Sequence, residues 1–323
     1  MIGLKQISFR TFAIHLEALT IRQKHYCILL QLTYNQPTAM KIILSTSELL
    51  RTISELKSQN STIGFVPTMG ALHSGHESLV KQSVAENDVT IVSIFVNPTQ
   101  FNNPTDLEKY PRNIDKDSIL LQSVGCSIVF APDATEMYAE NELKQTFEFD
   151  FNGLDLVMEG KFRPGHFNGV VQVVSKLFRL VQPTKAYFGE KDFQQLAIIH
   201  HMVKSMGFDV QIIDCPIIRE DTGLALSSRN ERLTAQQHKN AIHISKVLFE
   251  SRNFASQLSP QELTEWVTKE VNAKDDLEVE YFEIVDVHSL QQVTNWETKT
   301  VGCIAVFCGE VRLIDNIRYE SHL

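Results

Sequence analysis

The sequence predicts an α/β protein with a doubly wound parallel sheet in its first domain and a smaller α+β unit after it. Two observations support this prediction. Strand-like and helix-like runs alternate between residues 40 and 215, which is the pattern of parallel strands joined by right-handed helical crossovers. The run Val89–Val96 is almost continuously apolar, as in a strand buried on both faces. After residue 216 the alternation stops, and two helix-like runs precede three strand-like runs.

Apolar spacing and run length place the elements in order. The first helix is expected at 47–57, because Leu49, Ile53 and Leu56 recur at helical spacing after a serine start. The body of the next helix is expected at 79–86, and the other helices of the first domain at 114–124, 169–181 (ending before Pro183) and 192–206. Its strands are expected at 63–66, 89–96, 127–130, 186–188 and 210–213. The second unit is expected to hold helices at 234–251 and 260–272, then strands at 277–287, 301–308 and 311–314.

Composition narrows the class of protein. A chain of 323 residues is longer than one compact core usually takes, so two domains are expected. The net charge of −9, with no block of lysine and arginine, argues against nucleic-acid binding, which draws its affinity from basic patches. No apolar run approaches the roughly 18 residues of a membrane span. Five scattered cysteines without a C-x-x-C pair argue against a disulfide framework and indicate the cytoplasm.

Residues 1–39 form an N-terminal extension of different composition. It holds four basic residues against a single acid, Glu17, and shows no strand–turn–helix pattern. A basic, acid-poor start is typical of a transit peptide. The alternative is a start codon assigned too early, with Met40 as the start of the domain. The sequence leaves both interpretations open.

The segment Pro67–His76, PTMGALHSGH, carries the strongest chemical signal. It lies where a central strand ends and a helix begins, and ligands bind at this carboxyl edge in open α/β sheets. A helix N-terminus offers N–H groups and partial positive charge to phosphate, and Gly70 and Gly75 allow the backbone to come close. His73 and His76 are three residues apart, so both are expected on one side, donating hydrogen bonds to phosphate. A metal site would need a third ligand, which the spacing does not supply.

This H-x-G-H arrangement resembles the signature of the nucleotidyltransferase superfamily, which implies activation of a substrate by a nucleotide. Four further segments narrow the resemblance to one family. They are Val92–Phe101 (VSIFVNPTQF, followed by DLEKYPR at 106–112), Glu159–Phe167 (EGKFRPGHF), Tyr187–Leu196 (YFGEKDFQQL) and Arg219–Asn230 (REDTGLALSSRN). In this order, within a likeness running from about Met40 to the C-terminus, they are similar to the pantothenate synthetase family.

The resemblance implies a Rossmann-like domain of the HIGH-type nucleotidyltransferases at 40–215 and a smaller C-terminal domain at 216–323. It implies a homodimer that condenses pantoate with β-alanine to pantothenate, using ATP as a substrate with Mg²⁺. AMP and diphosphate are released, and the acid passes through an enzyme-bound pantoyl-adenylate. No nucleophilic serine or cysteine is needed, since no covalent enzyme intermediate forms.

Carried over to this sequence, the family motifs imply four catalytic residues: His73, His76, Lys191 and Arg229. The ATP-binding residues implied are Met69, Gly70, Ala71, Leu72, His73, Ser74, Gly75, His76, Gly189, Glu190, Lys191, Asp192, Ile218, Leu226, Ser227, Ser228 and Arg229. Their chemistry is consistent with this role, because a carboxylate that attacks ATP needs cations and N–H donors to screen the repulsion of two anions. Leu226–Arg229 takes the place of the superfamily's second signature, whose hydroxyls and cation follow the departing pyrophosphate.

Four further residues are implied in binding pantoate or β-alanine: Gln100, Gln195, Asn97 and Arg163. Both glutamines are neutral and offer donors and acceptors, which suits the hydroxyls and carboxylate of a polar acid. Without the resemblance each would be interpreted as a surface glutamine. Arg163 lies in a stretch rich in turn formers, which is either a plain connection or part of a cover that shields the adenylate from water.

Three acidic residues each have two interpretations. Asp192 is interpreted either as a helix N-cap or as a ligand of the nucleotide ribose. Asp115 and Asp117 lie where relatives place acids near magnesium, but the local match is poor, and a solvated helix face is the alternative.

Two rival functions follow from the same motifs. A different adenylyltransferase would carry a basic tRNA-binding domain or would lack the segments around Gln100 and Gln195. A non-catalytic nucleotide sensor would have lost at least one reactive residue. All six reactive residues are present: His73, His76, Lys191, Ser227, Ser228 and Arg229.

Overall fold

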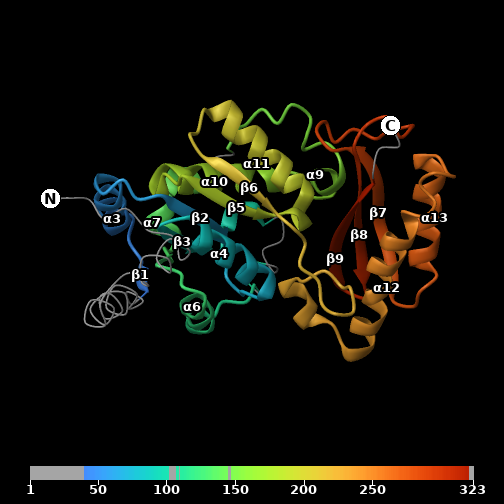
Figure 1. The fold of residues 1–323 in the computed structure, drawn as a ribbon, viewed down its shortest axis with the longest axis horizontal. Coiled ribbons are helices and arrows are strands. Elements are labelled where there is room, and N and C mark those ends of the chain that lie inside the picture. Colours follow the sequence, from blue (N-terminus) through green and yellow to red (C-terminus); the bar gives the residue numbers. More distant parts are fainter. Residues whose placement is uncertain (1–39, 102–106, 109, 145–146, 320–323) are drawn as a thin grey trace, which may run out of the picture. The chain divides into compact units, whose positions relative to one another are not determined.

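The computed structural model describes residues 40–101, 107–108, 110–144 and 147–319, so the expectations for residues 1–39 lie outside the described part. Six parallel strands form one sheet in the order β1-β4-β3-β2-β5-β6 (Figure 1). The strands are β1 (Lys41–Ile43), β2 (Ile63–Thr68), β3 (Val89–Ile94), β4 (Ile128–Phe130), β5 (Lys185–Gly189) and β6 (Gln211–Cys215). Sequence analysis missed β1, because three residues are too few to show a period.

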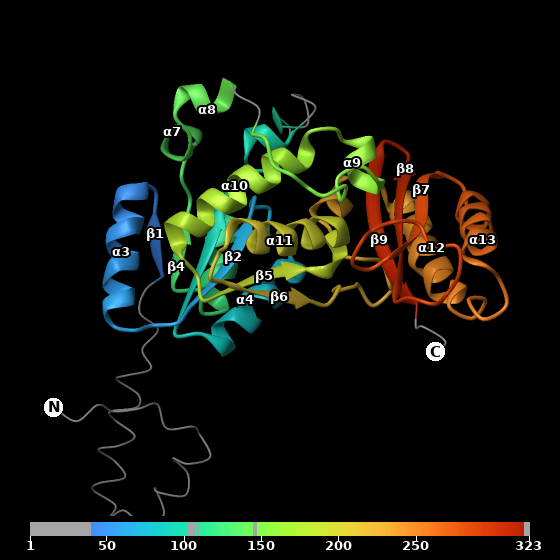
Figure 2. The ribbon, with the colours of Figure 1, turned by 90° about the horizontal axis from the view of Figure 1, so that it is seen from above.

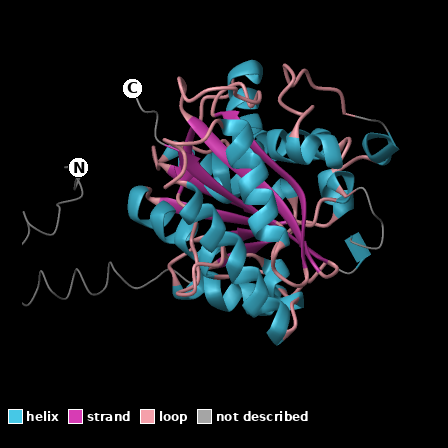
Figure 3. Cartoon of the chain, turned by 90° about the vertical axis from the view of Figure 1, so that its right-hand side faces the viewer, coloured by secondary structure: helices cyan, strands magenta, loops and turns pink. Residues whose placement is uncertain are grey.

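Helices cover both faces of this sheet (Figures 1 and 3). One face carries α3 (Thr46–Ser58), α10 (His166–Val181) and α11 (Phe193–Met206), and the other carries α4 (Ser74–Glu86) and α6 (Ile114–Ser123). Phe65 and Val66 are adjacent in β2 and both fully buried, yet they belong to different clusters, one on each face. Burial on both faces explains the continuous apolar run of the central strands and confirms the predicted α/β fold.

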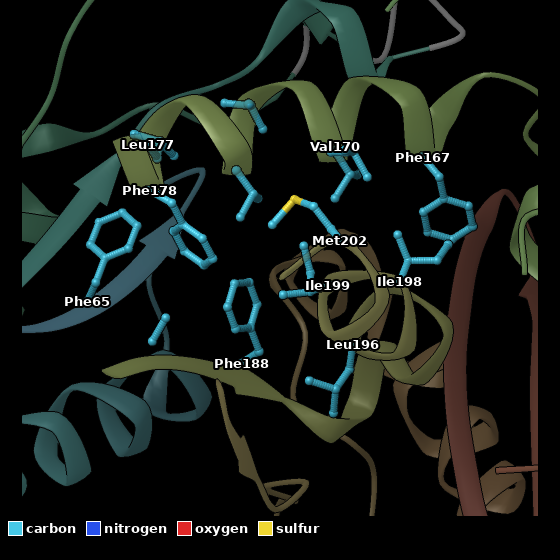
Figure 4. Close-up of a cluster of buried hydrophobic side chains, with 14 of the residues drawn as sticks. Phe65, Phe167, Val170, Leu177, Phe178, Phe188, Leu196, Ile198, Ile199 and Met202 are labelled. Carbon is cyan, nitrogen blue, oxygen red and sulfur yellow. The ribbon is translucent and has the colours of Figure 1, made fainter. Parts of the chain in front are cut away.

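The larger cluster lies between the sheet and helices α10 and α11 (Figure 4). In it, the ring of Phe178 on α10 meets Phe65 of β2 and Phe188 of β5 edge to face, at centroid distances of 6.2 and 6.4 Å. This packing joins α10 to two neighbouring strands, and Figure 2 shows the two helices side by side. This packing fixes β2 and β5 relative to α10.

The strand order reverses between β2 and β5. From β2 the chain proceeds to β3 and β4 on one side, and β5 and β6 then lie on the other side. The helices that follow β2 and β5 therefore leave the sheet on opposite faces and open a crevice between them. Such a switch point is where doubly wound sheets bind ligands.

Several short helices occur where the sequence analysis expected connections. They are α7 (Ala134–Met137), α8 (Glu140–Lys144), α9 (Met158–Phe162) and the 3-10 helices η1 (Pro98–Gln100), η2 (Glu190–Asp192) and η3 (Ser228–Arg232). Segments of three to five residues are shorter than two helical turns, so no apolar period reveals them. Among the longer helices, α10 begins at His166, three residues before the expected start.

A second, antiparallel sheet has the order β7-β8-β9. It consists of β7 (Leu277–Asp286), β8 (Thr300–Cys308) and β9 (Val311–Tyr319), with α12 (Ala235–Ser251) and α13 (Pro260–Asn272) on one face. Alternating residues of β8 divide between two clusters: Ile304 packs with α12 and α13, while Cys303 and Ala305 belong to the cluster of the first sheet. The smaller α+β unit is thus confirmed, and it shares a core with the parallel sheet.

Strand β9 ends at Tyr319, five residues past the expected end at 314. The sequence analysis missed these residues because Asp315, Asn316 and Arg318 interrupt the apolar pattern. The predicted boundary at 215/216 stays a prediction; β6 ends at Cys215, and both sheets belong to one compact unit. No helix in the described ranges combines the length and apolarity needed to cross a bilayer.

Candidate active site

A cavity of about 260 Å³ lies at the carboxyl edge of the parallel sheet. Segments that follow β2, β3, β5 and β6 line it, because parallel strands all end at one edge. The site residues predicted from the sequence that line it are Met69, His73, Gly75, His76, Gln100, Gly189, Lys191, Asp192, Gln195, Ile218, Leu226, Ser227, Ser228 and Arg229. Residues as far apart in the sequence as Met69 and Arg229 thus share one cavity.

His73 and His76 form a capping box at the start of α4. His73 is the N-cap residue, with extended backbone, and its Nδ1 accepts the N–H of Gly75 at 3.1 Å. The Nδ1 of His76 accepts the N–H of His73 at 3.4 Å, and the two ring centroids are 4.2 Å apart. Each imidazole therefore satisfies an N–H that the helix start leaves without a partner.

This arrangement decides which nitrogen of each ring carries the proton. Since Nδ1 accepts in both rings, a neutral ring must carry its proton on Nε2. Burial, with a smaller contribution from the nearby charge of Lys191, lowers the pKa of His73 to about 4. Burial also lowers the pKa of His76 to about 3, with smaller contributions from His73 and Lys191. At neutral pH the cavity therefore has two uncharged imidazoles whose Nε2–H groups are free to donate to a ligand.

Gly75 is required next to this pair. A Cβ at this position would lie 2.8 Å from Cε1 and 2.9 Å from Nδ1 of His73, closer than atoms pack. Any side chain here would displace the His73 ring from its N-cap position.

Asp117 of α6 holds the turn that precedes the histidines. Its buried carboxylate accepts the N–H of Ala71 at 3.0 Å and the N–H of Leu72 at 2.8 Å. Gly70 and Ala71 both have positive φ, +82° and +52°, and this conformation is unfavourable for an alanine. Both carboxylate oxygens of Asp117 are engaged with the backbone, and Asp115 lies exposed on the same helix.

The segment after β5 brings a cation to the histidines. Lys191 lies in η2, lines the cavity, and its charge acts on both imidazoles. Asp192 occupies the N-cap position of α11 but makes no capping hydrogen bond, and it lines the cavity beside Lys191. Glu190 does not line the cavity; its carboxylate pairs with Arg318 of β9 at 2.7 Å.

The segment Leu226–Arg229 also lines the cavity, and Leu226 lies close to Gly75. Its start is tied to the strand-end segment, because the N–H of Leu226 donates to the carbonyl of Ile218 at 3.0 Å. Ser227 caps η3 by accepting the N–H of Arg229 at 3.2 Å. Ser228 and Arg229 line the cavity together with Ser227, so two hydroxyls and a guanidinium are available to an anion.

Gln100 is held from behind by Asn97. The fully buried Asn97 donates from Nδ2 to Oε1 of Gln100 at 3.3 Å and to the carbonyl of Gly169 at 3.0 Å, and its Oδ1 accepts the hydroxyl of Tyr138 at 2.9 Å. Gly169 makes this contact possible, because a Cβ there would lie 2.4 Å from the carbonyl oxygen of Thr99. Asn97 does not line the cavity, so the structure places it behind Gln100.

Arg163 lies beside the main cavity, at the C-terminus of α9. It lines a smaller adjacent cavity of about 30 Å³, which it shares with Lys191, Asp192 and Gln195. Its guanidinium approaches the carboxylate of Glu159 at 3.4 Å, and burial lowers the pKa of Arg163.

Glu159 connects this region to the second sheet. Its carboxylate accepts two hydrogen bonds from Arg312 of β9, at 2.7 and 2.9 Å, and one from the hydroxyl of Tyr281 of β7 at 2.8 Å. Burial alone would raise the pKa of Glu159, but the hydrogen bonds and charge of Arg312 outweigh it and lower the pKa to about 2.

His166 contrasts with the other two histidines. Its Nδ1 lies 2.8 Å from the carbonyl oxygen of Gln100, which can only accept, so Nδ1 carries the proton. Burial lowers the pKa of His166 to about 4. This ring supports the backbone of Gln100 and lines the smaller cavity.

Sequence analysis missed the apolar wall of the cavity and the supports from the second sheet. Helix α10 contributes the wall through Val170, Val173, Val174 and Leu177. These residues follow ordinary core spacing, so no signal separates them from the rest of the helix. Four other residues predicted to bind ATP are not among the lining residues: Gly70, Ala71, Leu72 and Ser74. The first three lie in the turn before α4, and Ser74 is the first residue of that helix.

No metal centre is evident in the part of the chain that the structure describes. No three histidine, cysteine or acidic side chains gather there as metal ligands. Both oxygens of Asp117 already accept backbone N–H groups, and Asp115 is not among the lining residues.

Comparison with known proteins agrees with this geometry. Residues 41–318 match the family model described as pantoate-beta-alanine ligase. The pantothenate synthetase of Bacteroides fragilis strain YCH46 is 56% identical over 284 residues, which are 87% of this chain and 100% of that protein. A crystal structure of pantothenate synthetase from Thermus thermophilus has a TM-score of 0.81 at 38% identity, covering 87% of this chain and 100% of that one.

A second solved structure carries ligands. It is the pantoate-beta-alanine ligase of Francisella tularensis complexed with beta-gamma ATP and beta-alanine, with a TM-score of 0.72 at 38% identity over 87% of this chain and 98% of that one. These similarities confirm the family predicted from the motifs: the chain belongs to the pantoate–β-alanine ligase family.

Proposed function

We propose that this cavity joins pantoate to β-alanine in two steps, with ATP as the source of energy. In the first step, a carboxylate oxygen of pantoate attacks the α-phosphorus of ATP, the bond to the β-phosphate breaks, and diphosphate leaves. In the second, the amine of β-alanine attacks the acyl carbon, loses a proton, and displaces AMP to form pantothenate. Family membership and the ligands of the Francisella relative support this reaction.

The observation that carries the proposal is the set of donors in one cavity. The Nε2–H groups of His73 and His76 lie near the ammonium group of Lys191, and Arg229 lines the same space. As the carboxylate attacks, negative charge moves onto the pyrophosphate, and preorganised donors and cations stabilise it. Neutral rings suit this role, because their N–H groups are already oriented by the capping box and need no change of protonation.

The part of the cavity lined by Gln100, Gln195 and α10 suits pantoate. Gln100 and Gln195 offer neutral amides to the hydroxyls and carboxylate, and they bind the acid without neutralising its nucleophilic oxygen. The valine and leucine side chains of α10 give an apolar wall for the two methyl groups of pantoate. Holding the acid and the nucleotide side by side supplies the positioning that the attack requires.

Mg²⁺ is expected to arrive with ATP. Magnesium in such sites is bound mainly by substrate phosphates and water, with one or two carboxylates. The described residues do not form a cage for it, and both oxygens of Asp117 are engaged. Phosphate oxygens of ATP and water are therefore the expected ligands of Mg²⁺.

Two properties of the family are proposed for this chain as well: assembly as a homodimer and location in the cytoplasm. Light scattering on the purified chain would test the first and should give twice the mass of the chain. A mass equal to one chain at all concentrations would contradict it. Fractionation of the producing cells would test the second.

A product assay tests the reaction. ATP, Mg²⁺, pantoate and β-alanine are supplied together and then omitted one at a time. The proposal predicts pantothenate, AMP and diphosphate in equal amounts, only with all four present. ADP and phosphate as products would mean acyl-phosphate chemistry and would overturn the mechanism. AMP without pantothenate would mean that the acyl group passes to water, and would contradict β-alanine as the acceptor.

A further inference from the structure

The segment that carries Lys191 has few supports of its own. Helix η2 is three residues long, its N-cap Gly189 makes no side-chain capping bond, and neither does Asp192 at the start of α11. A side chain that acts on phosphate must nevertheless be held to a fraction of an ångström. The support must therefore come from elsewhere in the chain.

Asn316 of β9 provides such a support. Its Nδ2 donates to the carbonyl oxygen of Glu190 at 2.8 Å and to that of Lys191 at 3.0 Å. Both partners are carbonyls, which only accept, so the amide can be placed in one orientation alone. The two hydrogens of one amide group are thus used on two successive peptide units of η2.

Asn316 is itself held in place. It is 5% exposed, and its backbone N–H donates to Oδ1 of Asp315 at 2.8 Å. Asp315 in turn accepts two hydrogen bonds from Arg219, at 2.6 and 2.8 Å, at the start of the segment that leads to Ser227 and Arg229. Two neighbouring residues of β9 therefore contact both segments that bring a cation to the cavity. Asn316 contacts the segment of Lys191, and Asp315 contacts the segment that leads to Arg229.

We propose that Asn316 is a positioning residue for the nucleotide step: it fixes the backbone of Glu190 and Lys191 and thereby the position of the Lys191 ammonium group on ATP. This inference deepens the proposed function and rests on it. The chemistry stays with Lys191, and Asn316 acts through it. A displacement of about 1 Å at a reacting group is enough to cost on the order of 10²-fold in rate.

The test compares two buried asparagines. Asn316→Ala removes both donors to η2. Asn240→Ala is the matched control, since Asn240 is 2% exposed, lies in α12, and donates from Nδ2 to Asp276 at 3.1 Å, away from the cavity. Asn316→Ser keeps one hydroxyl donor and serves as the rescue variant, and as the test variant where the alanine chain does not fold. Folding of each variant is checked by thermal unfolding.

Two readouts are measured on each folded variant: the affinity for ATP by calorimetry, and the exchange of labelled pyrophosphate into ATP in the presence of pantoate. We expect Asn316→Ala to lower exchange about tenfold or more, to weaken ATP binding, and to leave the KM for pantoate within about threefold. Serine should recover part of the loss, and Asn240→Ala should match the wild type in both readouts.

A double-mutant cycle separates positioning from plain loss of structure. In the Lys191→Ala background, the change at Asn316 should cost no more than about twofold, because residues that act through one another are not additive. A full, additive loss in that background, or wild-type exchange and ATP affinity in Asn316→Ala, would overturn the inference. A wild-type chain that binds ATP but shows no exchange would count against the proposed function instead, and the ATP affinities would still decide the role of Asn316.

Discussion

The two halves of the nucleotide region are supported in different ways. The histidines after β2 are held mainly by their own neighbours: His73 by Gly75 and His76 by the backbone of His73. Lys191, after β5, lies in a segment that is supported from β9, 125 positions along the chain. One half is assembled by local hydrogen bonds, and the other depends on the second sheet.

This difference shows what a short motif encodes. In PTMGALHSGH, the glycine, the capping geometry and both rings are all part of ten consecutive residues, while Asp117 holds the turn before the rings from a distant helix. The motif therefore predicts its own geometry. The segment GEKD at 189–192 contains the cation Lys191, but no side chain within it makes a capping hydrogen bond that would orient Lys191. Substitutions in the histidine segment test local support, just as the Asn316 substitutions test support from the second sheet.

The largest effect is expected from removal of a locally held donor. His76→Ala should lower pantoate-dependent pyrophosphate exchange by about 10² to 10³, because one preorganised donor to the transition state is lost. The fold should survive, since the change removes one long capping bond at the helix start. His200→Ala is the control, because His200 lies half-exposed on α11 and pairs with Asp214, away from the cavity. Exchange at the wild-type rate in His76→Ala would remove this residue from the mechanism.

A smaller effect is expected when the support is changed and both rings are kept. Gly75→Ala places a methyl group 2.8 Å from the ring of His73, so the ring must turn away and lose its bond to the N–H of residue 75. Exchange should fall by about 10- to 100-fold. The melting temperature should change little, because a side chain rather than backbone gives way. A large drop in melting temperature with normal exchange would mean that local capping supports the fold and not the chemistry.

The contribution of Asp117 to this half is tested by two aspartates on the same helix. Asp117→Asn leaves one of the two N–H groups of Ala71 and Leu72 facing an amide donor, so the free energy of unfolding should fall by about 1–3 kcal/mol. Asp115→Asn changes an exposed residue and should stay within about 0.5 kcal/mol. Urea unfolding measures both. Loss of activity in a stable Asp115→Asn chain would instead assign Asp115 a metal-binding role.

A difference in pH dependence is expected from the third buried histidine. The pKa of His166 is lowered from 6.5 to about 4 in the folded chain, mainly by burial, so the unfolded state binds more protons between these values. The free energy of unfolding should therefore decrease as pH falls from about 6.5 to 4, and this histidine should account for up to about 2 kcal/mol of the loss by pH 5.

His166→Asn offers a non-titrating amide donor to the carbonyl of Gln100. Its unfolding free energy should fall less between pH 7 and pH 5 than that of the wild type, because the variant lacks one side chain that stays neutral in the folded chain but takes up a proton in the unfolded chain. Urea unfolding at the two pH values measures the difference. An equal loss in both chains would show that His166 is not held neutral.

Much of the fold and the site follows from the sequence. The central strands were predictable because burial on both faces leaves continuous apolar runs, and the cavity was predictable because the motif residues follow strands that end at one edge. The role of Asn97 was not, since an asparagine after a strand suits a ligand contact as well as a hydrogen bond to Gln100. The contacts of Arg312 with Glu159 and of Asn316 with Glu190 were not predictable either, because each spans more than 120 positions and only the packing of the two sheets forms it.

The central claim is that pantoate attacks the α-phosphorus of ATP in this cavity, and transfer of an oxygen isotope tests it most directly. Pantoate labelled with ¹⁸O in its carboxylate is converted in the presence of ATP and β-alanine, and the products are analysed by mass spectrometry. The mechanism predicts one ¹⁸O atom in AMP, because the attacking carboxylate oxygen leaves with the nucleotide, and none in diphosphate. Unlabelled AMP, or label in phosphate, would contradict attack at the α-phosphorus and with it the roles assigned to the histidines and Lys191.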